Sequence, residues 1–332
     1  MPDMTAPIKL GALVWPQYTT WPAFQGAMRR ADELGYESLW TWDHVYPIVG
    51  DPDGPILEAY TALAAVAATT SRATIGLMVG ANTFRNPALV AKMMTTIDHI
   101  SGGRAILGIG AAWFEEEHTA FGFPYGDGAP ERLRWFGQAL PIIRGMLDGT
   151  EPTVTEGVYR TSSVRNDPPP VQRHLPIIIG GSGRKVTLKL VAQYADANNL
   201  GNGDPDDLRD ADAALVAHCE AVGRNERQIE RTVEVQRVII RDSATEARRV
   251  HDSILRSNGG AEIDEDRPGS AGAALARTAV GTVDDIVAHI RPYLEVGYHH
   301  VLCGFPAPYD DETMVRLTTE VRPRLEAIVA GR

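Results

Sequence analysis

Cysteine is scarce in this sequence, and so is clustered positive charge. The two cysteines among the 332 residues, Cys219 and Cys303, lie far apart and outside any Cys-x-x-Cys motif. Neither a disulfide framework nor a thiolate metal site is therefore predicted. Asp and Glu number 43 against 32 for Lys and Arg, whereas nucleic acids and anionic membranes are bound through clustered positive charge. We expect a small-molecule ligand, and neither a nucleic-acid nor a membrane partner.

Long hydrophobic runs are also missing. No segment has the roughly 18 uninterrupted apolar residues of a membrane span. Residues 1–5 are not a basic segment followed by an apolar run, which is the pattern of a secretory signal. The expected location is the cytoplasm.

The common metal and hydrolase motifs are absent as well. His299 and His300 are adjacent, so on a strand they would point to opposite faces and could not chelate one ion together. The sequence has no His-Glu-x-x-His run and no Gly-x-Ser-x-Gly motif after an apolar strand. Neither a bound metal nor a hydrolase triad is expected.

What the sequence does contain is a regular alternation of short apolar runs with longer amphipathic runs. The apolar runs are typical of buried parallel strands, and the amphipathic runs are typical of helices. Because eight such units follow one another without a linker, they favour a closed (β/α)8 TIM barrel over an open doubly wound sheet. The predicted strands are 9–15, 38–42, 74–79, 105–109, 176–179, 197–200, 232–240 and 300–304. The predicted helices are 22–34, 59–70, 87–100, 131–147, 184–194, 205–222, 245–257, 282–296 and 311–329.

We predict a single barrel domain over residues 1–332, with insertions near 150–170 and 258–280. The first insertion, mainly 150–166, is typical of a β-hairpin followed by a proline-rich connector. Residues 258–272 in the second are rich in Gly, Asp and Glu without periodicity, and they predict a mobile loop or lid. Active-site residues are expected at the carboxyl ends of the strands.

An acid and an imidazole follow the second predicted strand, where Asp43 and His44 stand directly after Trp42. An imidazole can gain or lose a proton near neutral pH, so His44 is a candidate acid or base. The alternative is that Asp43 caps a helix and His44 only bonds a backbone carbonyl. The expected position at the barrel mouth favours the catalytic role.

The third predicted strand runs into small residues and then an Asn-Pro helix start, over residues 75–87. Small side chains after Val79 let the backbone approach a planar ring, and Pro87 suits the first turn of a helix. An ordinary strand-to-helix turn explains this segment equally well when it is taken alone.

The fourth predicted strand is followed by Ala111, Ala112 and Trp113. The Trp113 ring, beside backbone without side-chain bulk, would form a wall for an aromatic ligand, although core packing is an equal alternative. Three glutamates at 115–117 suit a helix N-terminus, so we expect them to be structural.

The fifth predicted strand leads into a glycine turn, which consists of Gly180, Gly181, Ser182 and Gly183. The backbone N–H groups of such a turn and the following helix N-terminus can bind phosphate, and a merely flexible turn is the alternative. The spacing is neither Gly-x-x-x-x-Gly-Lys nor Gly-x-Gly-x-x-Gly. Nucleoside triphosphates and a Rossmann dinucleotide site are therefore disfavoured.

Together these strand ends resemble the bacterial luciferase-like monooxygenase superfamily, and more closely its branch that uses the deazaflavin coenzyme F420. The resemblance covers nearly the whole chain, and its most specific parts are residues 42–44, 79–87, 101–117 and 179–183. It implies a (β/α)8 barrel with the cofactor ring at the mouth, and a non-prolyl cis peptide between Met78 and Val79 behind that ring. It also implies a homodimer packed through barrel helices.

The resemblance further implies a role for each group of site residues. His44 becomes the proton donor or acceptor, and we place Trp113 with it as a catalytic residue. Asp43 would contact the ring, Ala111 and Ala112 would lie along the ring or its tail, and the glycine turn would hold the phosphate. The expected cofactor contacts are Asp43, Met78, Val79, Ala81, Asn82, Ala111, Ala112, Gly180, Gly181, Ser182 and Gly183.

The sequence departs from one well-known type of member, the sugar-phosphate dehydrogenases that reduce this deazaflavin. Trp113 and Gln17 stand where those enzymes carry acids, and Ile48 stands where they carry an aromatic residue. With Trp15 close by, Gln17 and Ile48 form the expected substrate pocket, which would be less charged and more aromatic. An apolar or planar organic substrate is expected, and sugar-phosphate oxidation is in doubt.

The resulting functional hypothesis is hydride transfer between the deazaflavin and a small organic substrate. Reduction of an activated C=C or C=N bond, with His44 donating the proton, is the first choice. An FMN-dependent monooxygenase of the same superfamily is one alternative. A non-catalytic barrel that binds a flavin is the other.

Overall fold

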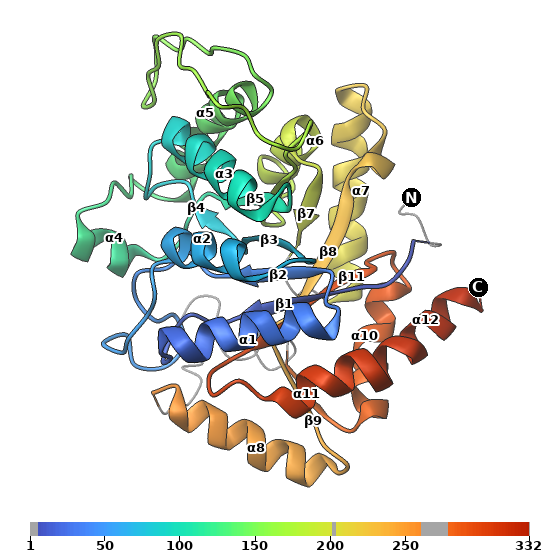
Figure 1. Cartoon of the computed structure of the whole chain (residues 1–332). Coiled ribbons are helices and arrows are strands. Elements are labelled where there is room, and N and C mark those ends of the chain that lie inside the picture. The colour runs from blue at the N-terminus through green and yellow to red at the C-terminus, as the bar shows by residue number, and fades with distance from the viewer. Residues whose placement is uncertain (1–5, 201–203, 260–277, 332) are drawn as a thin grey trace.

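Parallel strands form a closed barrel in the computed structural model, which describes residues 6–200, 204–259 and 278–331 (Figure 1). The main sheet has the order β3-β2-β1-β11-β8-β7-β6-β5-β4, and a further pairing of β3 with β5 closes it. The first and last of its strands in the chain are neighbours, with Lys9 opposite His300. The predicted (β/α)8 TIM barrel is confirmed. The barrel strands are β1 (Lys9–Val14), β2 (Ser38–Thr41), β3 (Thr74–Leu77), β4 (Gly80–Ala81), β5 (Ala105–Gly110), β6 (Ile177–Gly180), β7 (Ala197–Asn199), β8 (Glu230–Val235) and β11 (His300–Phe305).

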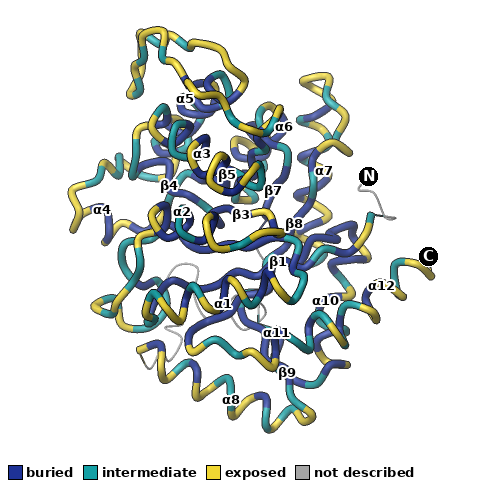
Figure 2. The backbone as a smooth tube through the Cα atoms, in the orientation of Figure 1, coloured by how far each residue is buried: buried dark blue, intermediate teal, exposed yellow. Residues whose placement is uncertain are grey.

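Helices surround this barrel, and Figure 2 shows that they are buried on the side facing the strands and exposed on the other. In α1, Phe24, Ala27, Met28 and Ala31 are buried at spacings of three or four residues, which places them on one face. The helices are α1 (Trp21–Leu34), α2 (Ala59–Thr69), α3 (Pro87–Ser101), α4 (Glu115–Phe121), α5 (Ala129–Leu147), α6 (Thr187–Tyr194), α7 (Pro205–Ala221), α8 (Ala244–Ser257), α10 (Val283–Leu294), α11 (Asp311–Arg316) and α12 (Arg322–Ala330).

The third barrel position is divided between β3 and β4. The peptide bond between Met78 and Val79 is cis, as predicted, and it lies between these two short strands. Both strands pair with β5, with Gly76 opposite Ile106 and Gly80 opposite Ile109. The β3–β4 side therefore has one more residue than β5 across this interval. The continuous strand predicted for 74–79 is wrong in its last two residues.

The strand predicted at 232–240 is also wrong in part, because the structure has two strands there. β8 ends at Val235, and β9 (Arg237–Ile240) pairs instead with β10 (Thr278–Gly281) in a separate two-stranded parallel sheet. Both segments are almost continuously buried. A buried apolar run carries no signal that separates one strand from two.

The two predicted insertions have different outcomes. In the first, the described hairpin is limited to a single antiparallel bridge between Val154 and Thr161, with two reciprocal backbone hydrogen bonds of 3.0 Å. The predicted antiparallel pairing of this hairpin is therefore confirmed, but the paired region is shorter than predicted. In the second, Asn258 and Gly259 are described, and the remainder of the predicted loop 258–272 lies outside the described residues.

The helices differ from the predicted set in two places. The three glutamates at 115–117 do begin a helix, α4, which was absent from the predicted set. The final predicted helix, 311–329, is interrupted by a π-helical turn at Leu317–Val321 between α11 and α12. Within the described residues, no helix combines the length and apolar character that a membrane crossing requires.

Both cysteines are buried, and burial raises the pKa of each thiol, that of Cys303 to about 12. These side chains belong to the packed interior.

Candidate active site

A cavity of about 520 Å³ opens at the carboxyl ends of the barrel strands. Its lining includes residues that follow β2, β5 and β6, together with the β3–β4 junction and the ends of β7 and β8. The predicted site residues found in this lining are Asp43, His44, Ile48, Met78, Val79, Ala81, Ala111, Ala112, Trp113, Gly180, Gly181, Ser182 and Gly183. Residues from distant parts of the sequence thus meet around one cavity.

Three residues predicted to contact cofactor or substrate are not part of the described lining. Trp15 is fully buried inside the barrel, with its ring centroid 4.5 Å from that of Trp42. Gln17 is also fully buried, and its amide donates to the carbonyl of Val49 at 2.7 Å and accepts from the N–H of Ile48 at 3.1 Å. Trp15 therefore supports the cavity from below, and Gln17 holds the loop that carries Ile48.

Asn82 is the third of these residues. Its amide nitrogen donates to the hydroxyl of Tyr159 at 3.1 Å, and that hydroxyl lies 3.3 Å from the Asn82 carbonyl oxygen. Tyr159 belongs to the first insertion, so Asn82 fastens that insertion to the strand end. Asn82 is not among the described lining residues, and its predicted role as a cofactor contact stays a prediction.

Asp43 forms a buried ion pair with Arg85. Its two carboxylate oxygens lie 2.7 and 3.1 Å from the guanidinium nitrogens, and one of them accepts the N–H of Ala81 at 2.9 Å. Arg85 also contacts Glu58, the N-cap of α2, at 2.5 Å. Burial raises the pKa of Asp43, and the Arg85 charge opposes that rise. This group ties the end of β2 to β4 and to the start of α2.

His44 is held by Glu117. The Nδ1 atom of His44 lies 2.9 Å from one carboxylate oxygen of Glu117, and the other oxygen accepts the N–H of Val45 at 3.0 Å. Glu117 is 1% exposed, so these two contacts occupy both of its oxygens. Because Nδ1 faces the carboxylate, Nε2 is the atom of His44 that can exchange a proton with a molecule in the cavity.

Trp113 lies at the rim of the cavity and is 55% exposed. Its ring stacks on Phe114 with centroids 5.4 Å apart and meets His44 edge-on at 5.6 Å. A large exposed aromatic side chain beside a cavity is available to contact a ligand. Packing in the core, the alternative considered above, does not apply to this residue.

Small residues make room for Val79 at the back of the cavity. A Cβ atom added to Gly110 would lie 2.9 Å from Cγ2 of Val79, and one added to Gly180 would lie 2.8 Å from the same atom. The Val79 side chain therefore sits between the ends of β5 and β6, and only glycine fits at either position without a shift.

The glycine turn continues this small-residue surface toward α6. Gly181 has φ +120°, a backbone conformation that other residues rarely adopt. A Cβ at Gly183 would lie 2.8 Å from the hydroxyl oxygen of Thr187, the first residue of α6, and Thr187 also lines the cavity. The turn and the Thr187 hydroxyl offer neutral donors to an anionic group.

Several lining residues were not predicted from the sequence. Arg132 and Thr187 lie in the first turns of their helices, and the sequence carries no signal for either. Glu234 and Gln236 could have been found, because they alternate with buried Val233 and Val235 and so share one face of the strand end. Within the described residues, no cluster of three or more His, Cys, Asp or Glu side chains is suited to a metal ion.

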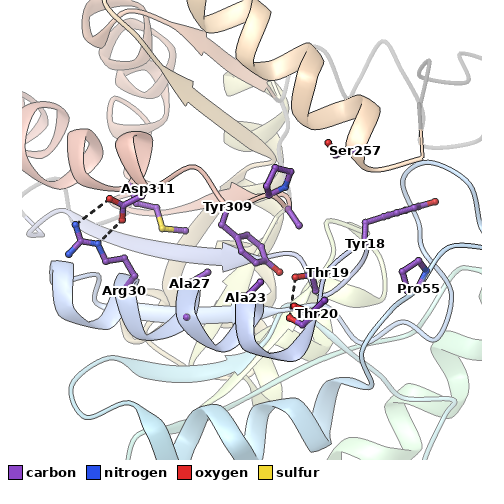
Figure 3. Close-up of a pocket in the computed structure, with 14 residues that line it drawn as sticks. Tyr18, Thr19, Thr20, Ala23, Ala27, Arg30, Pro55, Ser257, Tyr309 and Asp311 are labelled. Atoms are coloured by element: carbon purple, nitrogen blue, oxygen red, sulfur yellow. Dashed lines mark hydrogen bonds and ion pairs between the residues drawn. The ribbon is translucent and has the colours of Figure 1, made fainter.

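A second cavity, of about 860 Å³, lies between α1 and the segment that follows β11 (Figure 3). Its wall includes the small side chains Ala23 and Ala27 and the aromatic ring of Tyr309, and Figure 3 shows an ion pair of Arg30 with Asp311 at one end. None of the predicted site residues lines this second cavity.

This chain is similar to known proteins. A family model described as luciferase-like monooxygenase matches residues 6–300. The chain is 29% identical over 320 residues to a protein of Kineococcus radiotolerans named F420-dependent glucose-6-phosphate dehydrogenase, which covers 89% of this chain and 90% of the relative. A protein of Microbacterium testaceum with the same name is 28% identical over 319 residues, with 89% and 90% covered.

Solved structures share the fold at lower identity. An F420-dependent tetrahydromethanopterin reductase from Methanopyrus kandleri superposes with a TM-score of 0.77 at 20% identity, over 96% of this chain and all of that one. An F420-dependent secondary alcohol dehydrogenase in complex with an F420-acetone adduct gives a TM-score of 0.79 at 19% identity, over 96% and 99% of the two chains.

Proposed function

This chain belongs to the luciferase-like monooxygenase family, and from that membership we propose that it is an oxidoreductase that uses coenzyme F420. The observation that carries the proposal is a single cavity that combines the His44–Glu117 pair with a small-residue back wall and the glycine turn. Relatives named F420-dependent, which the chain matches over 90% of their length, support this cofactor.

The lining residues fit a flat ring that carries an anionic tail. Gly80, Ala81, Ala111 and Ala112 present little side-chain bulk, so a ring can approach the backbone there. The glycine turn would hold the phosphate of the tail through backbone N–H groups. Val79, seated between two glycines, would support the ring from behind.

When bound, the deazaflavin supplies hydride chemistry, and the protein supplies position and a proton. His44 would hold that proton on Nε2, because Glu117 occupies its Nδ1 side. Glu117, which is 1% exposed, fixes the orientation of the His44 ring through this contact. The Asp43–Arg85 pair keeps β4 in place beneath the cofactor site through the N–H of Ala81.

The apolar side chains in the cavity lining support a proposal for the class of substrate. Trp42, Ile48, Trp113 and Leu200 line it with apolar and aromatic surface, which favours a planar or apolar organic molecule. We propose reduction of an activated C=C or C=N bond in such a molecule, with His44 as the proton donor.

Titration of the purified protein with F420 and with FMN tests the cofactor. We expect F420 to bind at least tenfold more tightly than FMN, which is a difference of about 1.4 kcal/mol. Tight FMN binding together with substrate-dependent oxygen consumption would instead support the monooxygenase alternative. Failure to bind either cofactor would overturn the proposal.

A conversion assay tests the proposed reduction of a C=C or C=N bond. Reduced F420 is mixed with activated enones and imines, and its reoxidation is followed by absorbance. A cofactor that binds and is never turned over by any such acceptor would favour the non-catalytic alternative.

Homodimer formation, the cytoplasmic location and the single-domain organisation of residues 1–332 stay predictions.

A further inference from the structure

We propose that Gln236 donates a hydrogen bond from Nε2 to a carbonyl oxygen of the substrate, and that the cavity thereby selects a C=C bond activated by a carbonyl group over a C=N bond. The inference rests on the proposed function, because it names the substrate class of the same cavity. It gives a role to a lining residue that the sequence patterns did not predict.

Gln236 lies across the barrel from the expected cofactor ring. It directly follows β8 and lines the cavity. In the closed sheet, β11, β1 and β2 separate β8 from β3, whereas β7, β6 and β5 separate it from β4. The strand end that carries Gln236 is therefore opposite the β3–β4 junction, where Val79 would support the ring. A substrate that occupies the space between them would have the ring on one side and Gln236 on the other.

The side-chain amide of Gln236 leaves its nitrogen available to the cavity. The Oε1 atom is buried and has no hydrogen-bond partner among the described residues. The residue as a whole is nevertheless partly exposed and lines the cavity. Nε2 is not one of the buried unpaired atoms, and it makes no hydrogen bond within the described parts of the chain. Its two N–H donors can therefore bond a molecule in the cavity.

Close packing on β11 supports this orientation of the amide. A Cβ atom added to Gly304 would collide with the backbone carbonyl oxygen of Gln236, and it would lie 3.2 Å from Nε1 of Trp15. The indole Nε1 is a buried donor that also lacks a partner among the described residues. A buried amide oxygen suits this environment, because a buried NH₂ group would place donors beside a donor.

Glu234 is a second polar side chain at this strand end. It lies two positions before Gln236, lines the same cavity, and is separated from Gln236 by buried Val235. Its carboxylate disfavours an anionic group beside Gln236, because like charges repel more strongly where water is partly excluded. We therefore expect the substrate to present a neutral acceptor there. A carbonyl oxygen is a neutral acceptor that also activates a C=C bond.

Reduction of an enone needs two donors with different tasks. Hydride addition at the β carbon forms a C–H bond and shifts the C=C electrons to give an enolate, and the hydride carries both electrons from the reduced deazaflavin. Gln236 would stabilise the negative charge on the enolate oxygen by donating from Nε2. His44 would deliver a proton to the α carbon, which completes the saturated ketone. An imine takes hydride on carbon and a proton on nitrogen, so it needs no second donor.

The first arm measures turnover by Gln236→Met, with Gln228→Met as the matched control. Methionine keeps the length of the side chain and removes its donors. Gln228 is exposed and lies just before β8, at the other end of the barrel. With reduced F420, we expect Gln236→Met to lower kcat for 2-cyclohexenone roughly 100- to 1,000-fold. Its kcat for 2-methyl-1-pyrroline, a cyclic imine, and both values for Gln228→Met should stay within about threefold of wild type.

The second arm measures binding without turnover on protein loaded with oxidised F420. Acetophenone and α-methylstyrene have nearly the same shape, and only acetophenone carries an oxygen acceptor. We expect wild type to bind acetophenone at least tenfold more tightly. Gln236→Met should lower the ratio of the two affinities by roughly tenfold, and Gln228→Met should leave the ratio unchanged. Calorimetric titration measures both affinities.

The inference is overturned if Gln236→Met loses enone and imine turnover equally, or if its affinity ratio matches that of Gln228→Met. If Gln236→Met does not fold, wild type decides the matter, because reduction of the imine alone or equal affinity for acetophenone and α-methylstyrene overturns the inference. Reduction of the imine alone would leave the proposed function standing. Wild-type protein that does not bind F420, or that reduces neither class of acceptor, would mark failure of the proposed function itself.

Discussion

The contact between His44 and Glu117 joins two residues that are 73 positions apart in the sequence. Three consecutive glutamates begin α4, and the sequence suggests one shared structural role for them. Glu115 and Glu116 are exposed, whereas Glu117 is buried against His44 and Val45. Because side chains on a helix diverge by about 100° per residue, only one of three neighbours can face the site. Glu117 is a positioning residue, since it acts through His44.

We predict that Glu117→Gln lowers kcat roughly 10- to 100-fold while cofactor affinity changes little. A neutral amide bonds the Nδ1 side of the imidazole less strongly than a carboxylate does, so it fixes the orientation of the ring less firmly. The loss should therefore appear in kcat, while the KM for the organic substrate stays within about twofold of wild type. Steady-state kinetics with F420 as cofactor, together with a titration of cofactor binding, separate these effects.

Glu115→Gln is the control, because it removes the same charge from an exposed position in the first turn of the same helix. A kcat for Glu117→Gln that equals the kcat of Glu115→Gln would contradict the positioning role. His44→Ala should lose at least as much activity as Glu117→Gln.

The ends of β5 and β6 pack closely against Val79, which lies between β3 and β4. Its side chain occupies space that a Cβ at Gly110 or Gly180 would need. These glycines lie at the ends of β5 and β6, and Val79 lies between β3 and β4. The back wall of the cavity is therefore a packing unit made of three strands, and a change at one strand end is transmitted to the others.

We predict that Gly180→Ala destabilises the protein by about 1–3 kcal/mol and weakens cofactor binding, because Val79 has to move. The added Cβ would lie 2.8 and 3.1 Å from the two Cγ atoms of Val79. Val79→Ala removes both atoms, so the double variant should recover part of the lost stability. Chemical denaturation of the four members of this cycle measures the coupling.

Gly26→Ala serves as the control, since an added Cβ there meets nothing within 4 Å and the residue lies in α1. It should stabilise the protein by about 0.5–1 kcal/mol through the better helix propensity of alanine. Additive effects of Gly180→Ala and Val79→Ala would refute the proposed packing.

The two ends of the barrel have different polar groups. The cavity opens at the carboxyl ends of the strands, whereas Glu230 begins β8 at the amino ends. There it lies 2.7 Å from Nζ of Lys9 on β1 and 3.3 Å from Nδ1 of His300 on β11. This network joins the first and last barrel strands of the chain, so it supports closure of the barrel rather than catalysis.

Burial would raise the pKa of Glu230, but His300 and Lys9 outweigh that effect and hold the pKa at about 2. A carboxyl whose pKa is lower in the folded state stabilises that state above its ordinary pKa of about 4.5 and loses the effect as the pH falls toward 2. We predict that Glu230→Gln lowers the melting temperature at pH 7, and that its difference from wild type shrinks between pH 5 and pH 3. Thermal denaturation across this range measures the difference.

Glu33→Gln is a matched control, because Glu33 is 58% exposed and lies 3.8 Å from Arg29 in an ordinary surface pair. If the two variants follow parallel curves against pH, Glu230 does not contribute in the proposed way.

The helices and strands of the barrel were largely predictable, because the sequence patterns that predict them involve only a few neighbouring residues. The caps of α3 illustrate this point, since Asn86 accepts the N–H of Ala88 and Gly102 ends the helix in the left-handed conformation. Boundaries that depend on partner strands were predicted less well. The break after Val235 and the single bridge at Val154 are set by which distant strand is available for pairing.

The amino-acid sequence by itself determined the barrel and the set of strand ends that carry chemistry, because apolar periodicity, glycines and helix caps act over a few neighbouring residues. Only the tertiary structure decided which side chains reach the cavity. Gln17 was predicted to line it and instead holds the loop at Ile48, while Arg132 and Glu117 acquire their positions from α5 and α4. Those outcomes depend on the orientation of each side chain relative to elements distant in the sequence, and no local pattern encodes that orientation.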